Sequence, residues 1–339
     1  MDAVTEPATF ATTAVQVFFV MNVRNAIILP LLLLASGVLA VPATGHAQEA
    51  AKLIAQGDSL LAMDRPQKAI DKFTQAIEKD GSAASYSARA RAWYQMDRMD
   101  RFLLDADKAL KLDSTHAQAN FQRALYALRS EDFHNAERYA STCIRHAPVS
   151  MRSSALVIRG QARAELKQNS GAIADLEEGL GDRTEDLPAM KTLARAHDAA
   201  GDHAASLAVL EKLCAVEPYD IGNWTNRGFE LSALGRFEDA LTIYGEALAL
   251  DKDEPTVLSN KANSLLQLGR FDEALSDVQR SLKSYPSNAL ALRTRAILLA
   301  RKGEKEKACS DLHLARVLGG VADINKLIEE HCAGIQPKR

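Results

Sequence analysis

The amino-acid sequence predicts an all-α solenoid of eight helix pairs closed by one further helix, and three regularities support this prediction. A motif recurs with a stride of thirty-four residues, most clearly at 234–241 and 268–275, where Leu-Gly-Arg-Phe precedes two acids and Ala-Leu. One place in every repeat holds only glycine or alanine, and glycine and proline punctuate the chain at regular intervals. A repeat of this length buries its apolar face only by stacking on its neighbours.

The composition agrees with a repeat array. A chain of 339 residues would otherwise suggest two or three globular domains, but a solenoid grows lengthwise and leaves no room for a second domain. The 41 basic and 44 acidic residues nearly balance, which argues against a nucleic-acid-binding protein with a broad basic face.

Residues 21–47 predict a signal peptide. They combine a short basic region containing Arg24, an apolar run from Ala26 to Ala40, and small residues before a cleavage site. We expect cleavage after Ala47, with Ala40 as the second choice, and therefore an exported protein that is periplasmic or secreted. The alternative is an uncleaved membrane anchor, for which the apolar run is short.

Residues 1–20 fit an export signal poorly, because they contain Asp2 and Glu6 and no basic residue. We therefore expect them to be a misassigned N-terminal extension, with the true start at Met21. The cleavage region contains no cysteine, which argues against a lipoprotein.

Eight repeats follow between residues 50 and 320, and they share small residues where two helices are expected to cross. They begin near Ala50, Ala83, Ala117, Ser153, Leu187, Ile221, Pro255 and Ala289. Their eighth place holds Gly57, Ala90, Ala124, Gly160, Ala194, Gly228, Ala262 and Ala296. Their twentieth place holds Ala69, Ala136, Ala172, Ala240, Ala274 and Ala308, with Phe102 and Ser206 as exceptions. In the last four repeats Gly201, Gly235, Gly269 and Gly303 lie where a tight turn favours glycine.

These residues resemble the tetratricopeptide repeat (TPR) family, and the best single match runs from Trp224 to Leu250. The resemblance covers residues 50–320 and is weakest in the first three repeats. It implies a right-handed superhelix of paired helices, whose first helices line a concave groove that binds peptides or partner proteins.

A charge pattern inside the repeats predicts ion pairs between the two helices of a pair. The seventh place is usually basic, and every repeat with aspartate at the twenty-third place has that basic residue sixteen positions earlier. The expected pairs are Arg89 with Asp105, Arg159 with Asp175, Lys261 with Asp277, and Arg295 with Asp311. The fifth repeat has Leu193 and Val209 at these places instead. The alternative is that these charges lie on solvated helix surface.

Arg123 and Arg227 occupy the same basic place without that aspartate. We expect them to turn to neighbouring acids such as Asp132 or Glu230, or else to contact a ligand.

The outward places of the first helices in repeats two to four predict the partner-binding residues. Phe121, Leu125 and Leu128 recur at helical spacing and suggest an apolar anchor site. The full set is Arg91, Tyr94, Phe121, Gln122, Leu125, Leu128, Arg129, Val157 and Gln161. The alternative is a shift of one residue in the third repeat, which would place Phe121 and Leu125 in ordinary packing between helices.

Residues 321–339 are expected to form a capping helix and a tail, since a finite solenoid must cover its last apolar face. Of the four cysteines, Cys143 and Cys214 fall at core places, whereas Cys309 and Cys332 could join the cap to the array by a disulfide. A zinc site that combines these two cysteines with His313 and His331 would have no recognised spacing.

No catalytic or phosphate-binding motif occurs in the chain, so we expect no enzymatic activity, no cofactor and no metal. The predicted function is a scaffold that binds a peptide or partner protein outside the cytoplasm. The partner is of unknown identity, nucleic acid is not expected, and a membrane is involved only if the signal remains as an anchor. The alternatives are an accessory subunit of an envelope enzyme or assembly machine, and a glycan- or small-ligand-binding protein.

Overall fold

A computed structural model describes residues 45–181 and 185–333 of the chain, and all regular structure in them is α-helical. These residues form two compact bodies, which are described separately: an N-terminal body, residues 45–181, and a C-terminal body, residues 185–333. The predicted extension and nearly all of the predicted signal peptide lie outside the described residues.

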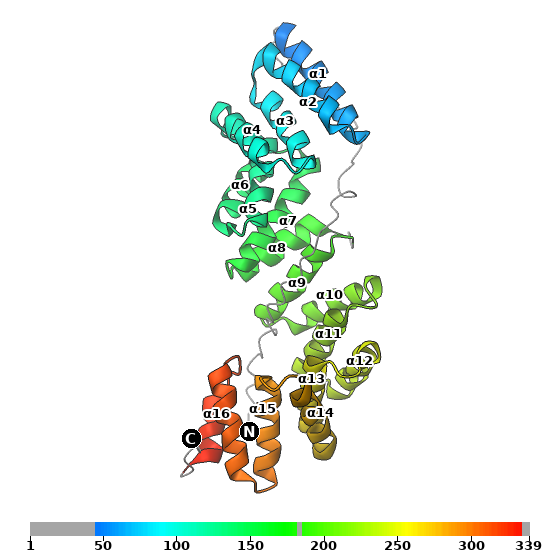
Figure 1. Cartoon of the computed structure of the whole chain (residues 1–339), viewed down its shortest axis with the longest axis vertical. Coiled ribbons are helices and arrows are strands. Elements are labelled where there is room, and N and C mark those ends of the chain that lie inside the picture. The colour runs from blue at the N-terminus through cyan, green and yellow to red at the C-terminus, as the bar shows by residue number, and fades with distance from the viewer. Residues whose placement is uncertain (1–44, 182–184, 334–339) are drawn as a thin grey trace. The chain divides into compact units, whose positions relative to one another are not determined.

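The N-terminal body consists of four helix pairs (Figure 1). Its helices are α1 (Gly45–Ala62), α2 (Pro66–Asp80), α3 (Ala83–Gln95), α4 (Met99–Leu112), α5 (Ala117–Arg129), α6 (Phe133–His146), α7 (Val149–Glu165) and α8 (Asn169–Leu180). Each odd-numbered helix packs on the next even-numbered one, and the even-numbered helix then packs on the first helix of the following pair.

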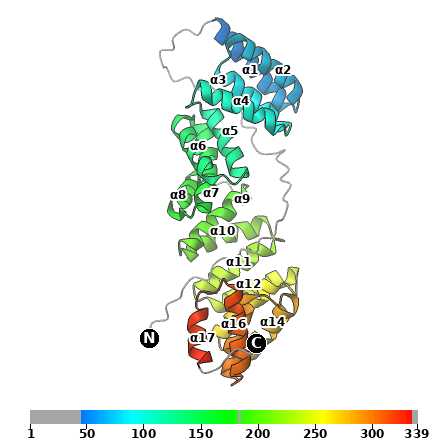
Figure 2. The same ribbon diagram turned by 60° about the vertical axis from the view of Figure 1, so that its left-hand side comes forward.

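The C-terminal body repeats this arrangement and adds a closing helix, which lies beside α16 in Figure 2. Its helices are α9 (Leu187–Ala199), α10 (His203–Val216), α11 (Ile221–Ala233), α12 (Phe237–Leu250), α13 (Pro255–Gln267), α14 (Phe271–Ser284), α15 (Ala289–Arg301), α16 (Lys305–Leu318) and α17 (Ile324–Cys332). The described chain therefore has the predicted all-α fold of eight helix pairs and a cap.

Six of the eight first helices begin at the residue where we expected their repeat to begin. Their starts are fixed by N-cap side chains; Asp186 and Asp220, for example, accept hydrogen bonds from the backbone amides of Ala189 and Asn223. The fourth repeat differs, because its first helix begins at Val149 rather than near Ser153, with Pro148 at the N-cap position and no capping hydrogen bond from its side chain. The first helix begins at Gly45, and its first buried residue is Ala50.

The small residues at the eighth place let bulky side chains of the second helix fill the crossing. A Cβ atom added to Gly57 would lie 2.3 Å from the ring of Phe73, and one added to Gly228 would lie 2.4 Å from that of Tyr244. Both rings are fully buried. Glycine at these places therefore makes room for an aromatic side chain, as the sequence pattern indicated.

The three-residue turn within each pair has a left-handed residue at its centre, and the two bodies fill it differently. In the C-terminal body it is always glycine, for example Gly235 with φ 74°. In the N-terminal body it is Asp64, Asp97, Glu131 or Lys167, with φ between 55° and 61°. A side chain at positive φ is strained, so the N-terminal body carries a conformational cost that the C-terminal body avoids.

In the second repeat Phe102 takes the place that alanine usually fills. It is buried, and the rings of Tyr94 and Tyr126 lie 5.3 and 6.0 Å from its own. The next core residue on the same helix is Ala106, where other repeats have larger residues such as Phe73. Phe102 and Ala106 thus exchange the small and large residues that Ala69 and Phe73 supply in the first repeat, and the helix crossing stays filled.

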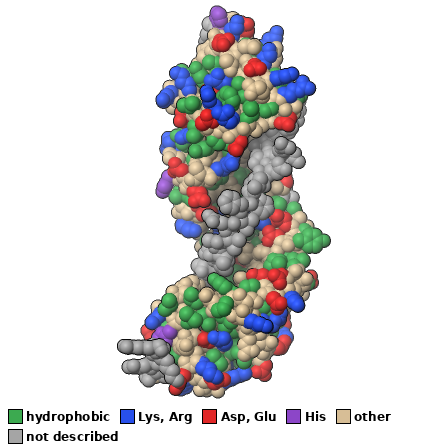
Figure 3. All heavy atoms as spheres, in the orientation of Figure 1, with side chains coloured by type: hydrophobic (Ala, Val, Ile, Leu, Met, Phe, Trp, Pro, Cys, Tyr) green, Lys and Arg blue, Asp and Glu red, His purple; other side chains and the backbone are tan. Residues whose placement is uncertain are grey.

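Charged side chains of both signs are interspersed on the visible faces of both bodies (Figure 3). Within the described ranges, no helix has both the length and the apolar content needed to cross a membrane.

Candidate functional site

In the N-terminal body the first helices of successive pairs contact one another, so their outward residues form a continuous face. In the N-terminal body α1, α3, α5 and α7 lie against each other in this order. We call the face that they share the first-helix surface. Its partly or fully exposed residues include Asp58, Arg91, Tyr94, Phe121, Leu125, Leu128, Arg129 and Gln161.

Seven of the nine predicted binding residues therefore lie on this surface, and two do not. Gln122 is buried under the preceding first helix, and its side-chain amide donates a hydrogen bond of 2.8 Å to the carbonyl of Ser87 there. Val157 is buried against Gly179 of α8. The prediction that Gln122 and Val157 contact a partner was wrong, because neighbouring helices cover both side chains.

The predicted apolar anchor residues have a double role. Phe121 packs against the buried cluster of Cys143, Ile144, Ala155 and Leu156, and Leu125 and Leu128 pack against the cluster around Ala124. All three nevertheless remain partly exposed. Packing between helices thus uses one side of each residue and leaves the other side on the first-helix surface.

Polar contacts cross from one first helix to the next. Arg91 and Asp58 form an ion pair with 2.6 Å between Nη2 and Oδ1, and Nη1 of Arg129 donates to the Tyr94 hydroxyl at 2.7 Å. Burial raises the pKa of Asp58, and the charge of Arg91 opposes that shift. These contacts hold the helices in register and fix the direction of the polar groups on the surface.

The structure brings together all four predicted ion pairs between the helices of a pair. Arg89, Arg159 and Arg295 each bind their aspartate through two nitrogens, at 2.6 to 2.8 Å, and Nζ of Lys261 lies 2.6 Å from Oδ2 of Asp277. The hydrogen bond to aspartate is the main cause of the raised pKa of each arginine. All four aspartates are buried, so these charges are part of the packing between helices.

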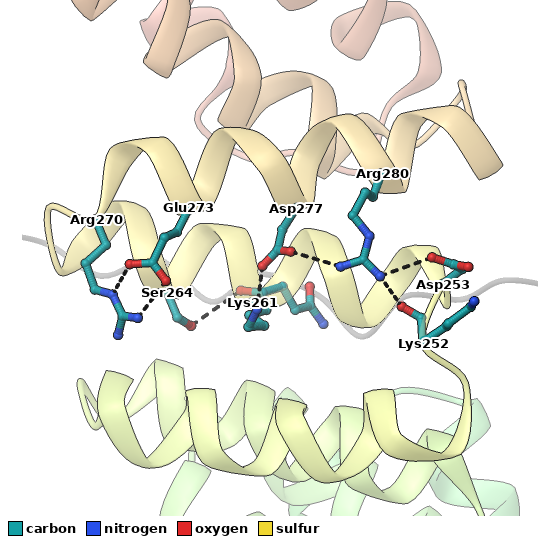
Figure 4. A network of polar contacts seen from close by, with 9 residues as sticks. Lys252, Asp253, Lys261, Ser264, Arg270, Glu273, Asp277 and Arg280 are labelled. Carbon is teal, nitrogen blue, oxygen red and sulfur yellow. Dashed lines mark hydrogen bonds and ion pairs between the residues drawn. The ribbon is translucent and has the colours of Figure 1, made fainter.

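Further donors satisfy the buried carboxylates. The indole nitrogen of Trp93 donates to Asp105 at 3.1 Å, and Arg163 lies 2.9 Å from Asp175. In Figure 4, Arg280 joins Asp277 to Asp253 and to the backbone carbonyl of Lys252 on the preceding loop. Several donors therefore fix the position of each buried carboxylate, and hydrogen bonds from charged donors are the stronger ones.

The two arginines without the usual aspartate find acids other than those we expected. Arg123 pairs with Asp107 at 3.2 Å and Arg227 with Glu211 at 3.3 Å, in place of Asp132 and Glu230. Asp107 lies on α4 and Glu211 on α10, each the second helix of the preceding pair, whereas the usual aspartate lies on the second helix of the same pair. Both contacts therefore join one repeat to the repeat before it.

The closing helix α17 covers the last pair. Ile324 and Leu327 join the buried cluster of α15 and α16, and the Cα atoms of Cys309 and Cys332 lie 5.5 Å apart with their sulfurs joined in a disulfide. Cys143 and Cys214 are buried, and burial raises the pKa of both thiols to about 11. These two thiols are therefore unreactive packing residues near neutral pH.

A buried polar cluster formed by Asp198 of α9, His203 of α10 and Glu230 of α11 was not predicted from the sequence. Nδ1 of His203 lies 2.8 Å from Oε2 of Glu230 and 3.4 Å from Oδ1 of Asp198. Ser206 donates a hydrogen bond of 2.7 Å to Oε1 of Glu230. Glu230 is fully buried and Asp198 is 5% exposed.

Burial shifts the titration of both acids in this cluster. Desolvation raises the pKa of Asp198 to about 6, against the opposing charge of His203. Desolvation, with a contribution from the charge of Asp198, raises the pKa of Glu230 to about 7. In the sequence, only Ser206 at the twentieth place could have indicated this cluster, because a hydroxyl at a buried place needs a polar partner nearby.

Comparison with known proteins supports the repeat assignment. A family model described as "Tetratricopeptide repeat" matches residues 54–117 and 259–312, and a second model of the same description matches residues 221–254.

Several solved structures are similar in fold. One is a tetratricopeptide repeat protein from Parabacteroides merdae ATCC 43184, with 14% identity, coverage of 74% of this chain and 99% of that chain, and a TM-score of 0.43. PilW, a type IV pilus biogenesis factor, has 18% identity, coverage of 60% and 93%, and a TM-score of 0.47. YrrB, described as a TPR protein with an unusual peptide-binding site, has 18% identity, coverage of 66% and 97%, and a TM-score of 0.41.

Proposed function

Since the chain belongs to the tetratricopeptide repeat family, we propose that it is a non-enzymatic scaffold that binds a peptide or partner protein on its first-helix surface. The observation that carries this proposal is the composition of that surface on α3 and α5. Partly exposed Leu125 and Leu128 lie on the same helix as Arg129, whose guanidinium contacts Tyr94 of the preceding first helix.

The chemistry of this region suits a peptide with apolar side chains and an acceptor group. The Tyr94 hydroxyl accepts from Arg129 and keeps its own hydrogen for donation, and the contact uses one of the five N–H donors of Arg129. Tyrosine and arginine are enriched among residues that dominate binding energy at interfaces. Because neighbouring helices hold these side chains, little conformational entropy remains to be lost on binding.

Site-specific photocrosslinking tests this proposal. A photoreactive phenylalanine analogue at position 125 should capture a polypeptide in the organism that makes the protein. The same analogue at position 104 is the control, because Leu104 lies on the second helix α4 and is 66% exposed. Absence of any polypeptide adduct at position 125, or identical adducts at both positions, would contradict the proposal. An adduct with an envelope enzyme or assembly protein would identify the scaffold as an accessory subunit.

We also propose that the protein is exported and that its signal is removed after Ala47. Support comes from the basic, apolar and small-residue segments of residues 21–47, and from the paired Cys309 and Cys332, since disulfides persist mainly outside reducing compartments. Mass spectrometry of the natural protein should find Gln48 as its first residue. An N-terminus at Met1 or Met21 in the mature protein would contradict cleavage.

A further inference from the structure

The cluster in the C-terminal body collects acids at places where the other repeats have none. Asp198 occupies the twelfth place of the fifth repeat, and Glu230 occupies the tenth place of the sixth. At the place of Asp198 the other repeats have Leu61, Tyr94, Leu128, Ala164, Ser232, Leu266 and Ala300. At the place of Glu230 they have Ser59, Ala92, Tyr126, Ala162, Ala196, Ser264 and Leu298. Packing of the repeat therefore does not require either acid.

The buried charge of the cluster is poorly balanced by the protein. Two carboxylates face a single imidazole, and an ionised carboxylate is costly to bury unless it is paired and hydrogen-bonded. Nδ1 of His203 can donate only one hydrogen, and the closer acceptor is Glu230. Oδ1 of Asp198 is buried, points at this nitrogen and has no hydrogen bond.

From this geometry we propose that Asp198, His203 and Glu230 bind one divalent first-row transition-metal ion of the Zn²⁺ type. One nitrogen and two carboxylate oxygens, one from each residue, all lie within 4.8 Å of one another. Zinc bonds of about 2.0–2.2 Å to such ligands place neighbouring ligand atoms roughly 3.4 Å apart in a tetrahedron. The observed separations of 2.8 and 3.4 Å from Nδ1 require only a small adjustment.

The ligand types select the class of ion. Imidazole together with carboxylate suits Zn²⁺ and its first-row neighbours, whereas Ca²⁺ and Mg²⁺ prefer sites made only of oxygen. Two carboxylates would neutralise a divalent cation. Three protein ligands leave a fourth position for water or for a group from a partner.

The surroundings fit a metal site in two further respects. Ser206 donates to the second oxygen of Glu230 and so fixes the carboxylate, as groups that support metal ligands commonly do. The His203 side chain is 17% exposed, which gives an ion access from solvent through the start of α10. A bound ion would join α9, α10 and α11, and therefore the fifth repeat to the sixth.

Titration of the full, metal-free chain with Co²⁺ and Zn²⁺ near neutral pH tests this proposal. We expect one equivalent of Co²⁺ to give the visible absorption of a four- or five-coordinate ion, and Zn²⁺ to displace it. Zn²⁺ at about one hundred times its Kd should raise the Tm by roughly 5 °C or more. In hydrogen exchange, Zn²⁺ should protect α9, α10 and α11.

Conservative variants identify the ligands. Asp198→Asn and Glu230→Gln should each weaken binding by at least about tenfold, in line with the loss of a charged ligand. Asp202→Asn is the matched control: Asp202 caps α10 from outside the cluster, and asparagine is an equally good cap. The proposal is overturned if the natural sequence binds no stoichiometric Co²⁺ or Zn²⁺, if Zn²⁺ protects other helices instead, or if folded variants bind as before. The natural-sequence titration and exchange decide the question even if a variant does not fold.

Discussion

Replacing Asp277 by alanine should destabilise the C-terminal body by about 2–3 kcal/mol. The change leaves Lys261 facing the crossing of α13 and α14 without its carboxylate partner. Breaking a fully buried ion pair costs about 3–5 kcal/mol, because an uncompensated charge stays out of water. The Asp277 side chain is only 8% exposed, but that of Lys261 is 26% exposed, so the ammonium regains part of its hydration. The loss should therefore fall at or below the lower end of that range.

A double variant separates the lost partner from lost packing. Lys261→Leu with Asp277→Val reproduces the apolar pair that the fifth repeat has at Leu193 and Val209. Replacing a buried ion pair by apolar residues of similar size is often neutral or stabilising. The double variant should therefore lie within about 1 kcal/mol of the natural sequence.

Urea denaturation followed by circular dichroism measures these free energies, and hydrogen exchange in α13 and α14 reports them locally. Glu273→Ala is the surface control, since the exposed Glu273 of the same helix pairs with Arg270 at the N-cap position of α14, as Figure 4 shows. It should leave the transition unchanged. Unfolding of Asp277→Ala at the same urea concentration as the natural sequence, or a double variant as unstable as the single one, would contradict a stabilising buried ion pair.

Three further predictions concern the turns, the disulfide and the buried acids. Lys167→Gly should stabilise the N-terminal body by about 0.5–1 kcal/mol, because it relieves positive φ, while Gly235→Ala should destabilise the C-terminal body; thermal unfolding that moves the other way would refute this. Mutating Cys309 and Cys332 to serine should lower the free energy of unfolding by about 3 kcal/mol, because the disulfide closes a loop of 23 residues. In the natural sequence, thiol counting in denaturant without reductant should find two free thiols rather than four. Because folding raises the pKa of Glu230 to about 7, the folded chain binds the proton of the Glu230 carboxyl group more tightly than the unfolded chain does. The stability that this bound proton contributes is lost as the pH rises from about 4.5 to 7. In chelator-treated protein the stability of the natural sequence relative to Glu230→Gln should therefore fall over that interval, by up to about 3 kcal/mol, and a flat difference would contradict the raised pKa.

The features that repeat along the chain could be predicted from sequence. The sixteen-residue spacing of Arg159 and Asp175 predicts their contact because both residues belong to one pair, whose geometry the repeat fixes. The turn glycines and the small residues at helix crossings were recognisable for the same reason. One repeat departs from the others: its first helix begins directly after Pro148, at Val149, ahead of the expected position.

Features that depend on contact between repeats were harder to predict. Gln122 has an outward place in its own helix, but the preceding first helix covers it and accepts its hydrogen bond. Asp198 and Glu230 lie 32 residues apart on different repeats, and nothing in either repeat alone indicates that His203 lies between them. Exposure and clustering follow from how closely neighbouring repeats approach, which residue spacing alone does not specify.

The central claim is that the first-helix surface binds the partner, and the most direct test is the affinity of the crosslinked partner for two charge variants. Arg129→Glu changes the exposed arginine beside Leu125, whereas Leu104→Glu places the same charge on α4, away from that surface. With both variants folded, Arg129→Glu should weaken binding at least tenfold, as expected for an interface arginine worth more than about 1.4 kcal/mol, and Leu104→Glu should leave the Kd unchanged. Equal affinities for the two variants, or a larger loss from Leu104→Glu, would contradict the account.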